Sequence, residues 1–401
     1  MPEPRRGGAI RSMKYITEIG KQQEHIVEET ITAKPHKKRL ANIEALRLLA
    51  MLMVLSLHFL DKGKVLSPLT QSLDATGYLA WALEALSIAA VDVYVLISAY
   101  FLVETGFRCK RLISLICQVL FYTILIPVIL IAIGVIDVST ITVYDILQSV
   151  LPVNMLQYWF VSAYVLMYLF TPVMNAAVHS MKRNQLKATI IIILLMESVA
   201  KTVLPVRLEL DNLGYDCLWF LTVYLIAAYI RLYGIPFLQN GKKAAITYVI
   251  FIAAIYGLVM LVRAIYLQTG ILENFISAPF GYNHLLTIMA AVAIFSAFRA
   301  WDFTGKAADA VCKLAPYTFG VYLIHEELYV RYAWPLWFGA DRITSPLGLL
   351  GHWLLGIIGM LLLCSVIDFV RAQSFRLAGK WLAGTRLARA LARVDQIVSG
   401  M

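Results

Sequence analysis

The chain has 401 residues, of which 60% are hydrophobic and only 15% are charged. Soluble domains carry about 25% charged residues, so this composition excludes an ordinary soluble protein and favours a polytopic membrane protein. The five cysteines show no CxxC spacing. We therefore expect neither a disulfide framework nor a metal site.

The two ends of the chain differ from its apolar body. Residues 1–38 are polar, mixed in charge and without apolar periodicity, which predicts a flexible cytoplasmic tail. Residues 39–370 form the expected membrane domain, and residues 371–401 the expected basic cytoplasmic tail.

Ten apolar runs are long enough to cross about 30 Å of hydrocarbon. They lie near residues 40–60, 78–103, 112–134, 157–178, 188–206, 215–233, 244–267, 282–300, 314–337 and 347–370. The expected fold is an all-α integral membrane bundle of about ten transmembrane helices, with both termini on one side.

Lysine and arginine are distributed unevenly between the two sides of this topology. The tails and loops on the side of the termini carry 27 of them, and the opposite loops carry 4. Because cytoplasmic loops are enriched in positive charge, both termini are predicted to be cytoplasmic. Topology then explains most of the net charge of +10, and we expect no nucleic-acid partner.

Four cations lie inside predicted spans. Lys201 and Arg263 are near outer helix ends, where long side chains reach the interface, so a structural role is expected. Arg331 has Glu327 four residues before it, which predicts an ion pair within the helix. The fourth cation, Arg47, belongs to the first span.

The first span, "RLANIEALRLLAMLMVLSLHFL", carries Glu44, Arg47 and His58. Eleven positions of an α-helix separate Arg47 from His58, so they lie roughly 16 Å apart along the axis but only about 20° apart around it. Glu44 lies one turn before Arg47 and can neutralise it. Ionisable groups at this depth indicate a bundle interior or a water-filled cavity.

The second span places Asp92 near its centre. A buried carboxylate is costly unless it is paired, so we expect Asp92 to contact a cation, a histidine or several donors, with Arg47 and His58 as the obvious candidates. Glu84 is nearer the outer end and is expected at the interface.

The ninth span contains Thr318, Tyr322 and His325 on one face, followed by Glu326 and Glu327. A packing role and a functional role for this histidine both remain open. In the fourth span, Trp159 and Tyr164 fit an aromatic interface belt as well as a substrate platform.

Several motifs occur together in a recognisable order. Arg47 and His58 are followed by "VDVYVLISAYFL" in the second span, "RCKR" at Arg108–Arg111, "YWFVSAYVLMYLFTPVMN" in the fourth span and "YTFGVYLIH" near the end. Over about residues 38–370, the chain resembles the membrane-bound acyltransferase-3 family.

The resemblance implies an enzyme that transfers acyl groups other than amino-acyl groups, as a multi-pass protein of a bacterial plasma membrane. It implies a cytoplasmic acyl-CoA donor, most often acetyl-CoA, which is a substrate and not a bound cofactor. The implied acceptor is a hydroxyl of a cell-surface saccharide or a glycolipid.

The resemblance also assigns roles to residues. We expect His58 to be the general base, with Asp92 stabilising its imidazolium and Arg47 orienting the donor. His325 is expected as a second acid or base, or as a residue that binds the acceptor. The residues expected to bind substrate, with Arg108 and Arg111 on the CoA phosphates, are Glu44, Ser98, Arg108, Arg111, Trp159, Tyr164 and Tyr322.

Alternatives remain open at this point. A transporter or flippase of a polysaccharide precursor would use the same buried charges along a path, and a non-catalytic sensor would not need His58. Direct transfer and an acyl-enzyme route, with Ser98 or a histidine as carrier, are both compatible with the sequence. The sequence leaves the oligomeric state undetermined.

Overall fold

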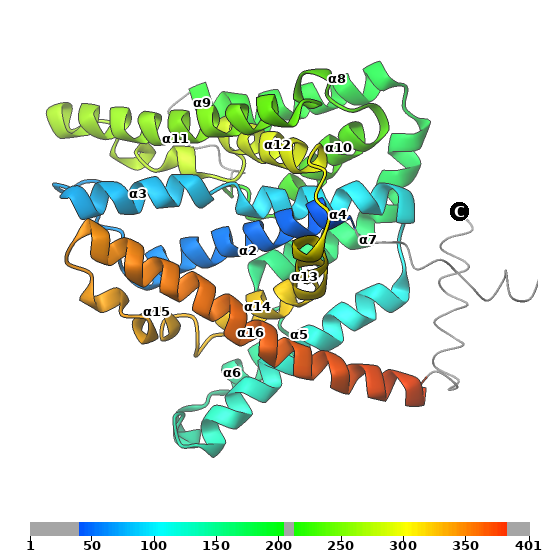
Figure 1. Cartoon of the computed structure of the whole chain (residues 1–401), viewed down its shortest axis with the longest axis vertical. Coiled ribbons are helices and arrows are strands. Elements are labelled where there is room, and N and C mark those ends of the chain that lie inside the picture. Colours follow the sequence, from blue (N-terminus) through cyan, green and yellow to red (C-terminus); the bar gives the residue numbers. More distant parts are fainter. Residues whose placement is uncertain (1–39, 204–211, 383–401) are drawn as a thin grey trace, which may run out of the picture. The chain divides into compact units, whose positions relative to one another are not determined.

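The computed structural model describes residues 40–203 and 212–382 (Figure 1). The tail expected over residues 1–38 and the C-terminal part of the tail expected over 371–401 lie outside these residues. The described part of the chain contains helices and irregular segments but no strand, which confirms the all-α class.

The α-helices in chain order are α2 (Ala41–Lys62), α3 (Ala75–Ser87), α4 (Ala90–Thr105), α5 (Cys109–Ala132), α6 (Val143–Val150), α7 (Trp159–Ser180), α8 (Arg183–Leu194), α9 (Ala200–Val203), α10 (Cys217–Tyr233), α11 (Gly241–Thr269), α12 (Leu285–Arg299), α13 (Lys306–Leu314), α14 (Thr318–His325), α15 (Trp334–Trp337) and α16 (Pro346–Leu382).

Seven helical segments of the described chain are long and apolar enough to cross a membrane. They are Ala41–Lys62, Ala75–Thr105, Cys109–Ala132, Trp159–Ser180, Gly241–Thr269, Glu273–Arg299 and Pro346–Ala378. Each coincides with one of the ten expected runs. The total of ten spans and the cytoplasmic placement of both termini stay predictions.

The other three expected runs have different forms. The run at 215–233 becomes α10, an apolar helix of 17 residues. The run at 188–206 begins as α8 and is interrupted by a π-helical turn, Leu195–Val199, before α9.

We expected one continuous helix over residues 314–337, but this run is interrupted. Helix α14 ends at His325, and Glu326 leaves the helical conformation with φ −97° and ψ 7°. Irregular turns follow until α15, which has Pro335 in its first turn. Irregular backbone at membrane depth is tolerated where it is buried in protein or lines a cavity. The break after His325 is therefore expected to lie beside a cavity or inside the protein.

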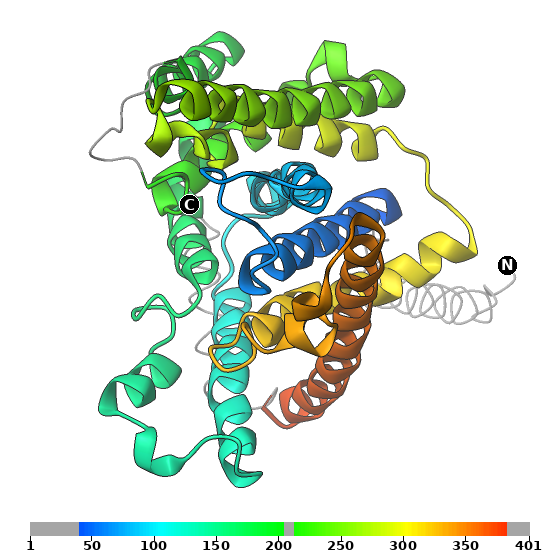
Figure 2. The ribbon, with the colours of Figure 1, turned by 90° about the vertical axis from the view of Figure 1, so that its left-hand side faces the viewer.

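Helices α2 and α4 form the centre of the bundle. Helix α4 packs against α2, α10 and α12, while α14 and α16 pack on α2. Figures 1 and 2 show α2 enclosed by these helices and α5 with α6 extending away from them. Buried residues make up 67% of the apolar window of α2 but 17% of that of α5, so most of the α5 surface is not covered by the described part of the chain.

The two ends of the bundle are called inner and outer after the direction of α2. The inner end is where α2 begins, on the right of Figure 1, and the outer end is where α2 ends. The charge distribution predicts that the inner end faces the cytoplasm.

A close approach between α14 and α16 fixes the helix that carries His325. A Cβ atom on Gly320 would lie 2.1 Å from Cγ of Asp368, so only glycine fits there. The buried Asp368 carboxylate accepts a hydrogen bond from Tyr122 at 2.7 Å and pairs with Arg371 at 2.9 Å. Helix α14 is therefore held against a satisfied ion pair.

Candidate active site

Two histidines meet at the outer end of α2. His58 lies near the end of α2, His325 is the last residue of α14, and 2.8 Å separates His58 Nδ1 from His325 Nε2. His325 is fully buried, whereas 21% of the His58 side chain is exposed. The structure thus brings together two of the residues predicted to be catalytic.

The hydrogen bonds assign the protons on both rings. His325 Nδ1 lies 2.7 Å from the carbonyl oxygen of Val321, which can only accept, so this nitrogen donates. When both rings are neutral, His325 Nε2 accepts and His58 Nδ1 donates to it. The lone pair of His58 is then on Nε2, where a general base needs it.

A carboxylate lies beside this pair. Glu326 Oε2 is 3.2 Å from His58 Nδ1, and Glu326 Oε1 is 3.5 Å from Arg331 Nη1. Glu326 is only 9% exposed, so these charges interact in surroundings of low polarity. If His58 gained a proton at Nε2, its positive charge would lie beside the Glu326 carboxylate, while its Nδ1–H continued to donate to His325.

The expected ion pair between Arg331 and Glu327 is wrong. Arg331 pairs with Glu326, while Glu327 accepts a hydrogen bond from the backbone amide of Tyr329 at 2.8 Å. The spacing of four residues predicts a contact only within a helix, and the helix ends at His325.

The expected contact of Asp92 with Arg47 or His58 is also wrong. Asp92 is fully buried and accepts a hydrogen bond from the Trp219 indole at 2.9 Å, and its second oxygen has no hydrogen-bond partner in the described part of the chain. The helix breaks at residues 88–89, which places Asp92 in the first turn of α4. The carboxylate is there bonded to α10 and not to α2.

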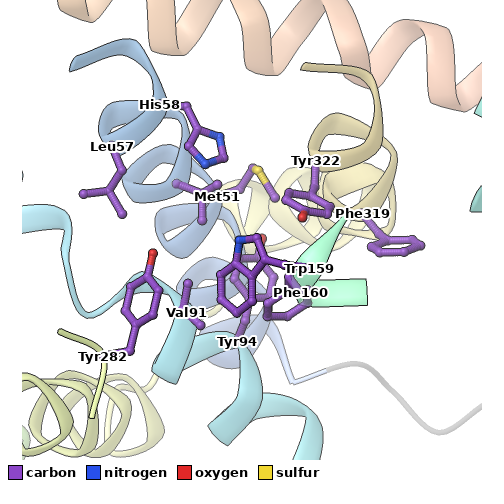
Figure 3. Close-up of a pocket in the computed structure, with 11 residues that line it drawn as sticks. Met51, Leu57, His58, Val91, Tyr94, Trp159, Phe160, Tyr282, Phe319 and Tyr322 are labelled. Carbon is purple, nitrogen blue, oxygen red and sulfur yellow. The ribbon is translucent and has the colours of Figure 1, made fainter. Parts of the chain in front are cut away.

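An apolar chamber opens on one side of His58 (Figure 3). Side chains converge on it from α2, α4, α7, α14 and the segment before α12. Its lining residues are Met51, Val54, Leu57, His58, Val91, Tyr94, Trp159, Phe160, Tyr282, Phe319 and Tyr322. The Tyr322 hydroxyl is buried without a hydrogen-bond partner in the described chain, and it points toward the middle of the chamber.

A more polar cavity lies on the other side of His58, at the outer end. His58, Leu57, Trp159 and Tyr282 line both spaces. The remaining lining residues of this outer cavity are Asp61, Lys62, Leu66, Trp81, Glu84, Ile88, Tyr215, Ser277, Phe280, Glu326 and Arg331. His58 therefore stands at the junction of an apolar chamber and a polar cavity.

The outer cavity combines aromatic faces with a buried carboxylate. The rings of Trp159 and Tyr282 stack 5.7 Å apart, and Tyr215 lies 4.4 Å from Trp159. Glu84 is half-buried, and its Oε2 atom is buried and has no hydrogen-bond partner in the described chain.

Arg47 lies toward the inner end of α2, on the chamber side. Its guanidinium pairs with Glu44 at 2.9 Å, as expected, and 26% of the Arg47 side chain is exposed. The Tyr94 hydroxyl, which lines the chamber, donates to the Arg47 carbonyl at 2.9 Å. The chamber wall is therefore connected to the predicted donor-orienting residue.

The other predicted substrate-binding residues gather at the inner end. The Tyr164 hydroxyl interacts with Ser98 and with the charges of Arg111 and Arg47. Arg108 contacts the Tyr168 hydroxyl through its backbone at 2.8 Å, and its side chain is exposed. These groups gather positive charge at the inner end of the bundle, and none of them lines the outer cavity.

The two histidines and Glu326 can be compared with the ligands of a metal site. His58 Nδ1, His325 Nε2 and Glu326 Oε2 lie within 4.8 Å of one another, and such groups bind zinc. Two nitrogens on one tetrahedral zinc lie roughly 3.3 Å apart, whereas these two are at a hydrogen-bonding distance of 2.8 Å. As placed, the residues fit a hydrogen bond and not a shared ion.

Comparison with known protein families gives a match over nearly the whole helical bundle. The sequence model of the acyltransferase-3 family, described as an acyltransferase domain, matches residues 40–369. The chain belongs to the acyltransferase-3 family. No curated protein and no solved structure matches it. The matched range begins one residue before α2 and ends within α16, so this membrane acyltransferase domain contains both histidines and both cavities.

Two residues of the candidate site, Glu326 and Tyr282, were not predicted from the sequence. Glu326 follows His325 directly in "YLIHEEL", but the carboxylate role went to Asp92 because Asp92 lies nearer the centre of an expected span. Tyr282 lies before α12 at the end of an irregular segment, and no periodicity points to it.

Proposed function

We propose that this acyltransferase moves a short acyl group, acetyl in the simplest case, from cytoplasmic acyl-CoA to a hydroxyl of a saccharide or glycolipid at the outer side. One observation carries the proposal: His58, with its lone pair assigned to Nε2, stands where the apolar chamber meets the outer cavity. Such a base can serve two substrates that arrive from opposite sides.

The inner end supports the donor assignment. Arg108 and Arg111 are exposed there and can hold phosphates by forked, charge-assisted bonds. The chamber beyond them has an open volume of about 50 Å³, which favours a small acyl group over a long chain.

The outer cavity supports the acceptor assignment. Its open volume is about 470 Å³, a size suited to a small ligand. Aromatic faces can pack on the apolar faces of a sugar ring, and Glu84 can hydrogen-bond its hydroxyls.

The proposed reaction is direct transfer. His58 Nε2 removes the proton of the acceptor hydroxyl while that oxygen attacks the thioester carbonyl carbon. The tetrahedral intermediate expels the CoA thiolate, which takes the proton from His58, so the products are an ester and CoA with a free thiol. Glu326 stabilises the transient imidazolium by its negative charge, Arg331 holds Glu326 in place, and His325 holds the orientation of the ring.

Tyr322 has the geometry of a second catalytic group. Its buried hydroxyl lacks a partner in the described chain and points into the chamber. We assign it to the thioester oxygen, where charge develops in the transition state and a fixed donor is worth most.

The test uses the purified protein in lipid nanodiscs with acetyl-CoA that carries a radiolabelled acetyl group. We expect slow release of acetate without acceptor and label transfer when a panel of methyl glycosides is added. A well-folded protein that moves a fluorescent lipid-linked sugar across vesicles without consuming acetyl-CoA would replace this proposal with the transporter alternative.

A further inference from the structure

A third cavity, an open groove, lies away from both histidines, between α8, α10, α11 and α12. Its open volume is about 650 Å³. Apart from Arg183 and Lys187, its lining is formed almost entirely by apolar and aromatic side chains, including Phe237, Phe251 and Met289. The part of the chain that lines this groove contains no carboxylate.

The sequence of α8 shows how the groove changes along its length. The α8 residues that line it follow helical spacing on one face, and they are Arg183, Lys187, Ile190, Ile191 and Leu194. The face begins with two cations and continues with three aliphatic residues. A ligand that matches it carries negative charge at one end and hydrocarbon along the rest.

The length of this face agrees with one membrane leaflet. Eleven helical steps separate Arg183 from Leu194, which corresponds to roughly 16 Å. Half of a 30 Å hydrocarbon core is about 15 Å. The cations lie at the inner end, where anionic lipids concentrate in a plasma membrane.

The mouth of the groove is built around Arg183. Its Nε donates to the Tyr229 hydroxyl at 3.3 Å, and its guanidinium lies 5.7 Å from the centre of the Tyr233 ring. These contacts leave other guanidinium nitrogens to form bidentate bonds with a phosphate. Lys187, one turn further along α8, adds a point charge.

We infer that this groove binds an anionic glycerophospholipid of the inner leaflet, with the phosphate on Arg183 and Lys187 and an acyl chain between α8 and α11. This binding site is independent of the acyl-transfer site, because none of its lining residues lines the chamber or the outer cavity.

The experiment measures lipid retention by native mass spectrometry on the full chain. Phosphatidylglycerol and phosphatidylcholine with identical acyl chains serve as probes. We expect wild type to prefer phosphatidylglycerol by about tenfold or more. The double variant R183Q/K187Q should lose this preference, and the control K306Q/K313Q, with two exposed cations of α13, should keep it.

A second variant tests the hydrocarbon part of the groove. Met289→Trp keeps both cations but fills the groove, so retention of phosphatidylglycerol should fall about tenfold. Thermal unfolding of each variant identifies any that does not fold. The inference is overturned if R183Q/K187Q retains phosphatidylglycerol as well as wild type, or if glycerol 1-phosphate competes as strongly as the whole lipid.

Discussion

The two spaces that share His58 differ in size and chemistry. The chamber has about 50 Å³ of open volume and an almost wholly apolar lining, while the outer cavity has about 470 Å³ and contains Lys62, Glu84 and Arg331. An acyl thioester and a sugar differ in the same way. One base can join two unlike substrates if each has its own compartment and only the reacting atoms meet.

The largest expected effect comes from replacing His58, the side chain shared by the chamber and the outer cavity. His58→Ala should lower acetyl transfer by about 10²- to 10⁴-fold and change acetyl-CoA binding little, because we propose that Arg108 and Arg111 at the inner end supply most of the donor affinity. Equilibrium binding and single-turnover transfer, measured on one preparation, separate the two effects. His179→Ala, at an exposed position on α7, is the matched control. Transfer at the wild-type rate by His58→Ala would eliminate the proposed base.

The second largest effect is expected from a change to Tyr322 in the chamber. Tyr322→Phe removes only the unpartnered hydroxyl and should reduce kcat by about 10²-fold with little change in acetyl-CoA affinity. The control is Tyr158→Phe, whose hydroxyl donates to the Leu323 carbonyl at 2.9 Å, so its loss should lower thermal stability more than kcat. Equal kcat values for Tyr322→Phe and wild type would remove Tyr322 from the reaction.

A pair of filling substitutions compares the two compartments directly. Val91→Phe narrows the chamber and should lower kcat/KM for acetyl-CoA about tenfold, whereas Ser277→Trp narrows the outer cavity and should lower kcat/KM for the acceptor by a similar factor. Initial rates with each substrate varied in turn measure both values. If both variants weaken the same substrate, the compartments are not separate.

The smallest expected effect concerns one hydrogen bond in the outer cavity. Glu84→Gln keeps the shape of the side chain but replaces one carboxylate oxygen with an amide NH₂ group. This change should raise KM for the acceptor substrate about fivefold. Donor affinity should stay the same, which isothermal titration with CoA measures. Glu104→Gln, exposed at the inner end, provides a control of the same chemistry. A change in CoA affinity in the Glu84 variant alone would contradict the assignment.

The sequence predicted the features that depend on local periodicity and depth. Apolar runs identified seven helices that can span a membrane, and the spacing of Arg47 and His58 placed them at different depths of α2. The pairing of Glu44 with Arg47 followed from one helical turn. These inferences needed no knowledge of neighbouring helices.

The features that the sequence did not predict depend on where helices break. The end of α14 at His325 turned Glu326 toward His58 and left Glu327 on the backbone of Tyr329. The break before α4 directed Asp92 to Trp219. The break before α4 lies in the apolar stretch 85–91, where a hydropathy pattern cannot show it. The break after α14 coincides with His325, Glu326 and Glu327, and polar residues also occur inside continuous helices.

The most direct measurement supplies the substrates on opposite sides of a membrane. Proteoliposomes with the protein in one orientation are given membrane-impermeant acetyl-CoA on one side and a methyl glycoside acceptor on the other. We predict transfer when acetyl-CoA is at the inner end, near Arg108 and Arg111, and the acceptor is at the outer end, near Lys62. Transfer that occurs only when both substrates share one side would show that the two compartments do not serve two sides of the membrane.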